Sequence, residues 1–73
     1  MRVEVVCYSG YRGEETPRAL VVGERRLEVK EVLGRWREPD RRYFELLCAD
    51  GATYLMSHDE EHDLWELSRR EPA

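Results

Sequence analysis

The chain lacks the features that mark a membrane protein, a disulfide scaffold or a zinc domain. Its apolar runs are short. The N-terminal run, MRVEVVCYSG, is interrupted by Glu4, so it predicts neither a signal peptide nor a membrane span. The two cysteines, Cys7 and Cys48, lie far apart with no CxxC pair, which predicts buried thiols and a reducing, cytoplasmic setting. Lysine is almost missing, because Lys30 is the single lysine among twelve basic residues.

Positive charge is scarce in the second half of the chain. Residues 1–42 carry ten basic and eight acidic side chains, a balance of +2, whereas residues 43–73 carry two basic and eight acidic, a balance of −6. A protein that binds phosphates along its whole length needs a net positive potential, which the overall charge of −4 does not supply. The length of 73 residues predicts one domain with a thin core.

Apolar and polar residues alternate along six short segments, which predicts β-strands rather than helices. The segments are residues 2–8, 18–22, 25–36, 42–48, 52–58 and a last strand that ends at Leu67. Residues 9–17 are expected to form a loop, residues 1–67 a single domain and residues 68–73 a polar tail. Six short strands in chain order predict an all-β fold, a small antiparallel six-stranded meander in an SH3-like or partly open barrel.

The first hairpin turn is predicted at Gly23-Glu24, which places Leu20 opposite Leu27. The third segment then changes parity, because its early apolar residues are odd-numbered and its later ones even-numbered. An extra residue near Lys30-Glu31 would bring both sets to one face, so we expect a β-bulge or sharp bend there. Glu38-Pro39-Asp40 reads as the next turn.

The turn at residues 49–51 separates the clearest pair of strands. A three-residue loop with Gly51 in the left-handed region places Leu46 opposite Tyr54 and Phe44 opposite Met56. A two-residue turn would slip this register and mix the two faces, so we favour the longer loop.

A four-residue turn at residues 59–62 is expected to return the chain, so that Trp65 faces Met56 and Leu67 faces Tyr54. The inward-facing set then defines a predicted core. Its members are Val3, Val5, Cys7, Leu20, Val22, Leu27, Val29, Val32, Trp36, Phe44, Leu46, Cys48, Tyr54, Met56, Trp65 and Leu67.

Residues 58–62, HDEEH, match the H-x-x-E-H zinc motif, which requires a helix that places both histidines on one face. The segment lies between two predicted strands, so we interpret it as a solvated turn in which His58 pairs with Asp63. A Cys2His2 site is disfavoured because no two cysteines lie close together. We therefore expect no cofactor, no metal site and no enzyme activity.

The candidate binding surface is a cluster of arginines and aromatic residues. Its members are Arg35, Trp36, Arg37, Arg41, Arg42 and Tyr43, with Tyr11 from the first loop. Such a cluster can stack on and neutralise single-stranded nucleic acid, or bind an acidic protein or the acidic half of another copy. It can equally be a solvated rim in which Trp36 is core and the arginines cover it.

Two further surfaces suggest a contact role. The aromatic and acidic residues Tyr8, Tyr11, Glu14, Glu15 and Trp36 partly resemble the peptide groove of SH3 domains. The face opposite the core carries apolar residues among polar ones, which suggests a contact surface or a dimer. These are Tyr43, Leu47, Leu55 and Leu64.

The segments VEVVCYSGYRGEETPRAL, EVLGRWREPDRRYF, DGATYL and LWEL together resemble a family of small bacterial cytosolic β-domain proteins with no assigned function. The resemblance spans nearly the whole chain and implies a stand-alone domain. It implies no site residues.

The sequence thus favours a non-catalytic binding or adaptor module that engages a protein partner or self-associates, without a membrane role. The alternative is a nucleic-acid-associated accessory domain that uses the arginine and aromatic cluster.

Overall fold

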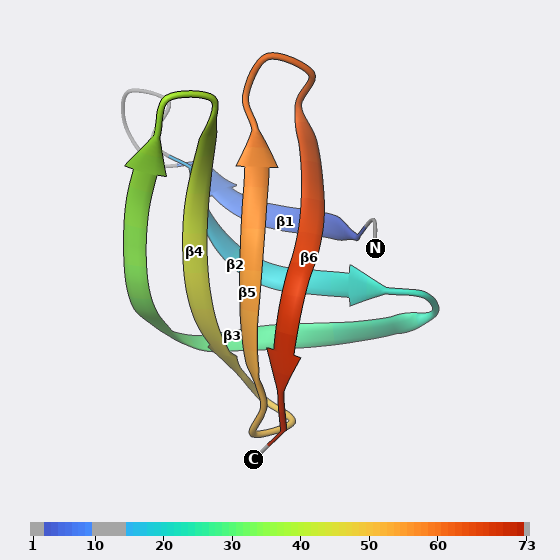
Figure 1. Ribbon diagram of the computed structural model, residues 1–73. Coiled ribbons are helices and arrows are strands. Elements are labelled where there is room, and N and C mark those ends of the chain that lie inside the picture. The colour runs from blue at the N-terminus through green and yellow to red at the C-terminus, as the bar shows by residue number, and fades with distance from the viewer. Residues whose placement is uncertain (1–2, 10–14, 73) are drawn as a thin grey trace.

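The computed structural model describes residues 3–9 and 15–72, and six antiparallel strands occupy most of them (Figure 1). The strands are β1 (Glu4–Ser9), β2 (Glu15–Val22), β3 (Arg25–Glu38), β4 (Arg41–Cys48), β5 (Thr53–Asp59) and β6 (Leu64–Glu71). They pair in chain order from β1 to β6. The described residues contain no helix, so the predicted all-β antiparallel meander is confirmed.

Strand β3 belongs to two halves of the structure. Its first part pairs with β2, and its second part, from Val29 onward, pairs with β4. The pairing register shifts between Val29 and Glu31 and again between Val32 and Gly34. Because bulges bend a strand and increase its twist, β1 and β2 run across β4, β5 and β6, and the sheet curls into a half-barrel (Figure 1). The first bulge confirms the prediction, and the second was not predicted.

The first hairpin turn depends on Gly23, whose φ of 63° lies in the left-handed region that glycine adopts without strain. Val22 pairs with Arg25 across this two-residue turn. Leu20 therefore faces Leu27, as predicted.

The loop at residues 49–51 has the predicted three-residue form. Gly51 has a φ of 85°, and its N–H donates to the carbonyl of Cys48 at 2.9 Å. The N–H of Cys48 donates to the carbonyl of Ala52 at 3.0 Å and closes the loop. This loop fixes the register of β4 and β5, in which Leu46 pairs with Tyr54 and Phe44 pairs with Met56, as predicted.

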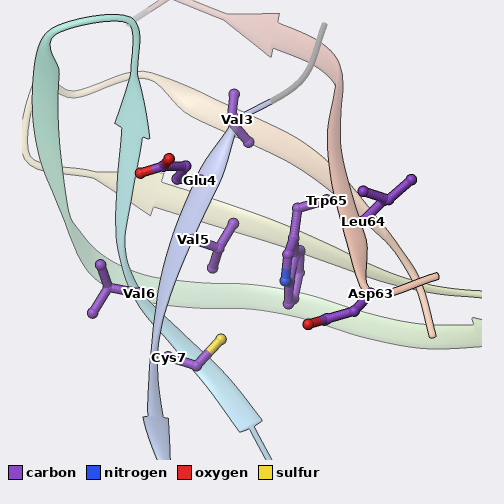
Figure 2. Close-up of a pocket in the computed structure, with 8 residues that line it drawn as sticks. All are labelled: Val3, Glu4, Val5, Val6, Cys7, Asp63, Leu64 and Trp65. Carbon is purple, nitrogen blue, oxygen red and sulfur yellow. The ribbon is translucent and has the colours of Figure 1, made fainter. Parts of the chain in front are cut away.

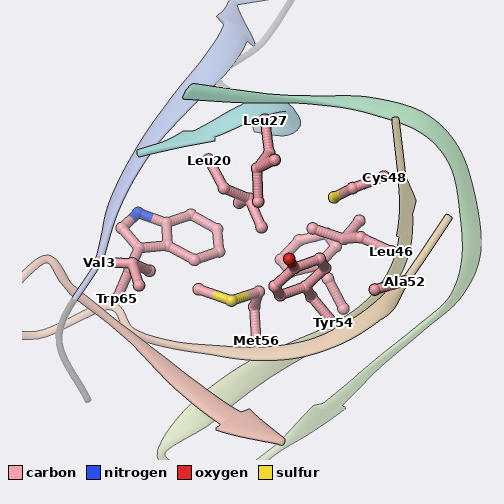
Figure 3. Close-up of a cluster of buried hydrophobic side chains, with 10 residues drawn as sticks. Val3, Leu20, Leu27, Leu46, Cys48, Ala52, Tyr54, Met56 and Trp65 are labelled. Carbon is pink, nitrogen blue, oxygen red and sulfur yellow. The ribbon is translucent and has the colours of Figure 1, made fainter. Parts of the chain in front are cut away.

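The core lies where the two halves cross. Figure 3 shows Leu20 and Leu27 of the first half pointing toward Met56, Tyr54 and Trp65 of the second. The buried cluster comprises Val3, Leu20, Leu27, Phe44, Leu46, Cys48, Ala52, Tyr54, Met56 and Trp65, with Val5, Cys7, Val22, Val29, Val32 and Leu67 packed against it. Every predicted core residue except Trp36 is in one of these two sets.

The assignment of Trp36 to the core was wrong. The second bulge in β3 shifts the parity once more, so Arg35 faces inward opposite Phe44, and Trp36 lies on the outer face opposite Tyr43. The residue is 45% exposed.

The predicted register between β5 and β6 was also wrong. Strand β5 continues to Asp59, and the turn occupies residues 60–63, with Asp63 at a φ of 52°. Trp65 consequently pairs with His58, and Met56 pairs with Leu67. The side chains predicted to face inward still do so, because the slip is by an even number of residues.

Strand β6 continues to Glu71, so residues 68–71 belong to the sheet and not to a tail. Arg70 is held there by Tyr54, whose hydroxyl accepts from Arg70 Nε at 3.1 Å and donates to Asp50 Oδ2 at 2.6 Å. Asp50 Oδ1 also accepts from the N–H of Ala52 at 3.1 Å. The hydrogen bond from Tyr54 is the main reason that the pKa of Asp50 is lowered. The contacts tie the end of β6 to the β4–β5 loop.

Residues 3–9 and 15–72 include no helix with the length and hydropathy that a membrane span requires.

The two tryptophans offer a matched test of this arrangement. Trp65 is 8% exposed, and its ring stacks on His58 with centroids 4.1 Å apart. We expect Trp65→Ala to lower the free energy of unfolding by about 3–5 kcal/mol. Trp36→Ala should lower it by about 1 kcal/mol, because that ring contributes a surface stacking contact. Urea denaturation followed by circular dichroism compares them, and equal losses would contradict the face assignment.

Candidate binding surfaces

The predicted arginine and aromatic cluster is divided by the strand alternation of β3 and β4. On the inner face, Arg35 lies opposite the buried Phe44, and Arg37 lies opposite Arg42. The other members, Trp36, Tyr43 and Arg41, lie on the outer face. Tyr11 lies outside the described residues. The strand alternation therefore divides the predicted cluster between the two sides of the sheet. A cavity of about 210 Å³ at this end of the β3–β4 hairpin is still lined by members from both sides, namely Arg35, Trp36, Arg37, Arg42 and Tyr43, together with Phe44.

On the outer face, the rings of Trp36 and Tyr43 are stacked. Their centroids lie 5.5 Å apart, and their planes differ by 8°, which is an offset parallel stack. The indole also lies close to Gly34, where an added Cβ would be 3.8 Å from its Cζ3 atom. With Trp36 45% exposed, the pair presents a broad, rigid aromatic surface to solvent.

Apolar and acidic side chains extend this surface across the sheet. Glu45 pairs with Leu55, and the next row places Leu47 opposite Thr53, so both leucines are on the same face as Tyr43. Glu66 lies opposite Ser57 at the far strand. We call this set, comprising Trp36, Tyr43, Leu47, Leu55, Glu45 and Glu66, the Trp36 surface.

The Trp36 surface lies on a face that is strongly acidic. In the rows that pair β3 with β4, β4 with β5 and β5 with β6, the outer-facing acids are Glu31, Glu38, Glu45, Asp59, Glu66 and Glu71, and the outer-facing arginines are Arg41 and Arg69. Six acids against two arginines leave a formal charge of −4. Both arginines are paired, since Arg41 contacts Glu66 at 3.1 Å and Arg69 contacts Glu71 at 3.2 Å.

Two of the three inner arginines, Arg37 and Arg42, share one carboxylate of the β5–β6 turn. Glu60 accepts a short hydrogen bond from Arg37, with a second contact at 3.4 Å, and lies 3.8 Å from Arg42 Nη1. The hydrogen bond from Arg37 is the main reason that the pKa of Glu60 is lowered. Arg42 also lies over the ring of Phe44, with 5.1 Å from its Cζ to the ring centroid.

Arg35 has no acidic partner among the described residues. Its guanidinium lies over the ring of Phe44, with 6.0 Å from Cζ to the ring centroid. On the outer face, Arg41 donates to Glu66, which is the main reason that its pKa is raised. Three of the four arginines of the predicted cluster, namely Arg37, Arg41 and Arg42, therefore have a carboxylate beside them.

The two histidines of the HDEEH segment are engaged separately. His58 is buried, and its Nε2 lies 2.9 Å from Asp63 Oδ1, which confirms the predicted pair. His62 is exposed, and its Nδ1 lies 2.9 Å from Asp59 Oδ2. Within the described part of the chain, no three His, Cys, Asp or Glu side chains converge as metal ligands.

The predicted SH3-like groove cannot be placed, because Tyr11 and Glu14 and the side chains of Tyr8 and Glu15 lie outside the described residues. The remaining member, Trp36, is on the outer face described above.

A cleft that sequence reasoning missed lies where β1 crosses the start of β6 (Figure 2). Its volume is about 590 Å³. It is lined by Val3, Glu4, Val5, Val6, Cys7, Asp63, Leu64 and Trp65. We call it the β1 cleft. No pattern in the sequence indicates it, because β1 and β6 are brought together only by the curl of the whole sheet.

The chain matches no protein-family model, and no curated protein or solved structure is detectably similar to it. The resemblance to a family of small bacterial proteins stays a prediction.

The pairing of Glu60 with Arg37 and Arg42 can be tested with a matched charge change. We expect Glu60→Ala to be retained more strongly on heparin than the wild-type protein, because two guanidinium groups lose their internal carboxylate. The control is Glu24→Ala, which removes the same charge from an exposed turn. If both variants elute from heparin at a salt concentration raised by the same amount, the retention depends only on net charge.

Proposed function

We propose that this domain is a non-catalytic binding module that engages a protein partner through the Trp36 surface. The observation that carries the proposal is the exposed stack of Trp36 on Tyr43 within an apolar and acidic face. The partner segment that fits this face carries lysine or arginine beside apolar residues.

The residue types support a protein contact. Tryptophan and tyrosine are enriched among the residues that dominate binding energies, because they bury a large area at a small cost in side-chain entropy. The stack also holds both rings in place before binding. Leu47 and Leu55, which are half-buried on the same face, add apolar area beside it.

The charge of the surface supports a basic partner. Glu45 has no salt-bridge partner among the described residues and lies in the row between Gly34 and Leu55. Acids around an aromatic face attract a cation, and the face of an indole is the strongest of the aromatic cation acceptors. A second copy of the chain fits less well, because two faces of charge −4 repel each other.

The alternative of nucleic-acid binding has weaker support. It requires the arginines of the predicted cluster to meet phosphates, yet Arg37 and Arg42 are beside Glu60, and Arg41 is beside Glu66. They also lie on opposite faces of the sheet, so one strand of nucleic acid would not meet all of them at once.

The cysteines support a non-catalytic, cytoplasmic role. Burial raises the pKa of Cys48 to about 11, so this thiol is protonated at neutral pH and is a poor nucleophile. Cys48 is buried and Cys7 is half-buried, and both are thiols, as expected in a reducing compartment.

Selection from a displayed library of random peptides tests the proposal. We expect the wild-type domain to enrich peptides that combine lysine or arginine with apolar residues. Their affinity should fall as salt rises, and it should fall about tenfold or more with Trp36→Ala, as expected for a central aromatic contact. The control is Val21→Thr, which changes a half-buried apolar residue of β2 that belongs to neither the Trp36 surface nor the β1 cleft.

Three results would contradict the proposal. They are a failure to enrich any peptide, enrichment of acidic peptides, and a selection in which the binding of every enriched peptide survives Trp36→Ala. Binding of a single-stranded oligonucleotide at low salt that is lost with Arg35→Glu would favour the nucleic-acid alternative.

A further inference from the structure

Among residues 3–9 and 15–72, no strand pairs with the outer edge of β1. The sheet order runs from β1 to β6, and within the described residues these two end strands pair only with β2 and β5, respectively. Every second residue along the outer edge of β1 therefore presents a backbone N–H and C=O that another strand can bind.

The sequence of β1 does little to protect this edge. Sheet edges are usually guarded by lysine, proline or inward-pointing charge. Residues 3–6 are Val-Glu-Val-Val, with one charge and three β-branched residues that favour strand pairing. Val6 is 38% exposed. The register shift between Val6 and Cys7 ends the regular stretch, so the edge offers a short segment to a partner.

The β1 cleft lies along this edge. Figure 2 shows Val5 and Cys7 projecting from β1 on the side of Trp65, with Asp63 beside the indole. The cleft volume, about 590 Å³, is within the range of roughly 300–1,000 Å³ that is typical of ligand sites. An added strand therefore has both backbone groups to bind and an apolar wall for its side chains.

The charges of the cleft define the occupant. Its lining contains two acids, Glu4 and Asp63, and no basic residue. The Asp63 side chain is 84% exposed, and one of its oxygens contacts His58, so the other can accept a hydrogen bond. A segment that places lysine or arginine near Asp63 and Glu4 is complementary to this lining.

We propose that the β1 cleft binds an extended segment of another protein by strand addition to the outer edge of β1. The segment alternates β-branched apolar residues with lysine or arginine. A second copy of β1 is the wrong occupant, because it would bring another Glu4 toward these two acids. The site is separate from the Trp36 surface, and the inference does not rest on the proposed function.

The test uses short acetylated peptides and the intact domain. The first peptide alternates valine with lysine, the second has glutamate for each lysine, and the third is the lysine peptide with every backbone nitrogen methylated. We expect the lysine peptide to shift backbone amide resonances of β1 and of residues 63–65. The glutamate peptide should bind about tenfold or more weakly, because like charges meet in the cleft. The methylated peptide should not bind, because it lacks the donors of a strand.

Two variants separate this site from the Trp36 surface. Val6→Lys places a protective charge at an exposed position of the edge, so it should weaken binding of the lysine peptide about tenfold or more without lowering the melting temperature. Trp36→Ala should leave this binding unchanged.

Several results would overturn the inference. One is no binding of the lysine peptide at millimolar concentration. Another is binding of the methylated peptide that equals binding of the lysine peptide. Two more are amide shifts that map to the Trp36 surface, and a dimer of the domain that dissociates when Val6 is replaced by lysine. The methylated peptide needs no protein variant, so this arm remains decisive even if Val6→Lys fails to fold.

Discussion

The bend of β3 is the constraint on which the rest of the structure depends. Two bulges within six residues, between Val29 and Glu31 and between Val32 and Gly34, allow one strand to pair with β2 on one side and β4 on the other. Without such a bend, six short strands would form a flat sheet with one face exposed, and no core could close. The crossing of the two halves brings Leu20 against Met56 and Trp65 and excludes water from them (Figure 3).

Both proposed binding surfaces follow from the same bend. The second bulge exchanges the faces beyond it, which places Trp36 on the outer face, where it stacks on Tyr43. It places Arg35 and Arg37 on the inner face, where Arg37 pairs with Glu60. The curl also carries β1 across β6 without pairing them, and this leaves an edge and a cleft. A closed barrel would have paired this edge and filled the cleft. The partial closure is therefore what leaves both proposed surfaces accessible on a small domain.

Much of the fold could be predicted because glycines and alternation constrain it locally. Gly23 and Gly51 fix two turns, and each turn fixes the register of the strands that follow. The face of Trp36 could not be predicted, because a second bulge has no residue signature as clear as a turn glycine. The β5–β6 register failed for a related reason, since the strained φ of Asp63 is compatible with several turns. The division of the arginine cluster could not be predicted either, because it follows from the same bulge. The β1 cleft could not be predicted because the strands that line it, β1 and β6, are far apart in the sequence.

Cross-strand nuclear Overhauser effects between β3 and β4 test the second bulge most directly. Contacts between the α-protons and amide protons of directly opposed residues report the register without reference to side chains. The structure predicts contacts that place Trp36 opposite Tyr43 and Arg35 opposite Phe44. Contacts that place Trp36 opposite Arg42 would mean that no second bulge exists. Trp36 would then face the core, and the surface built on it would not exist.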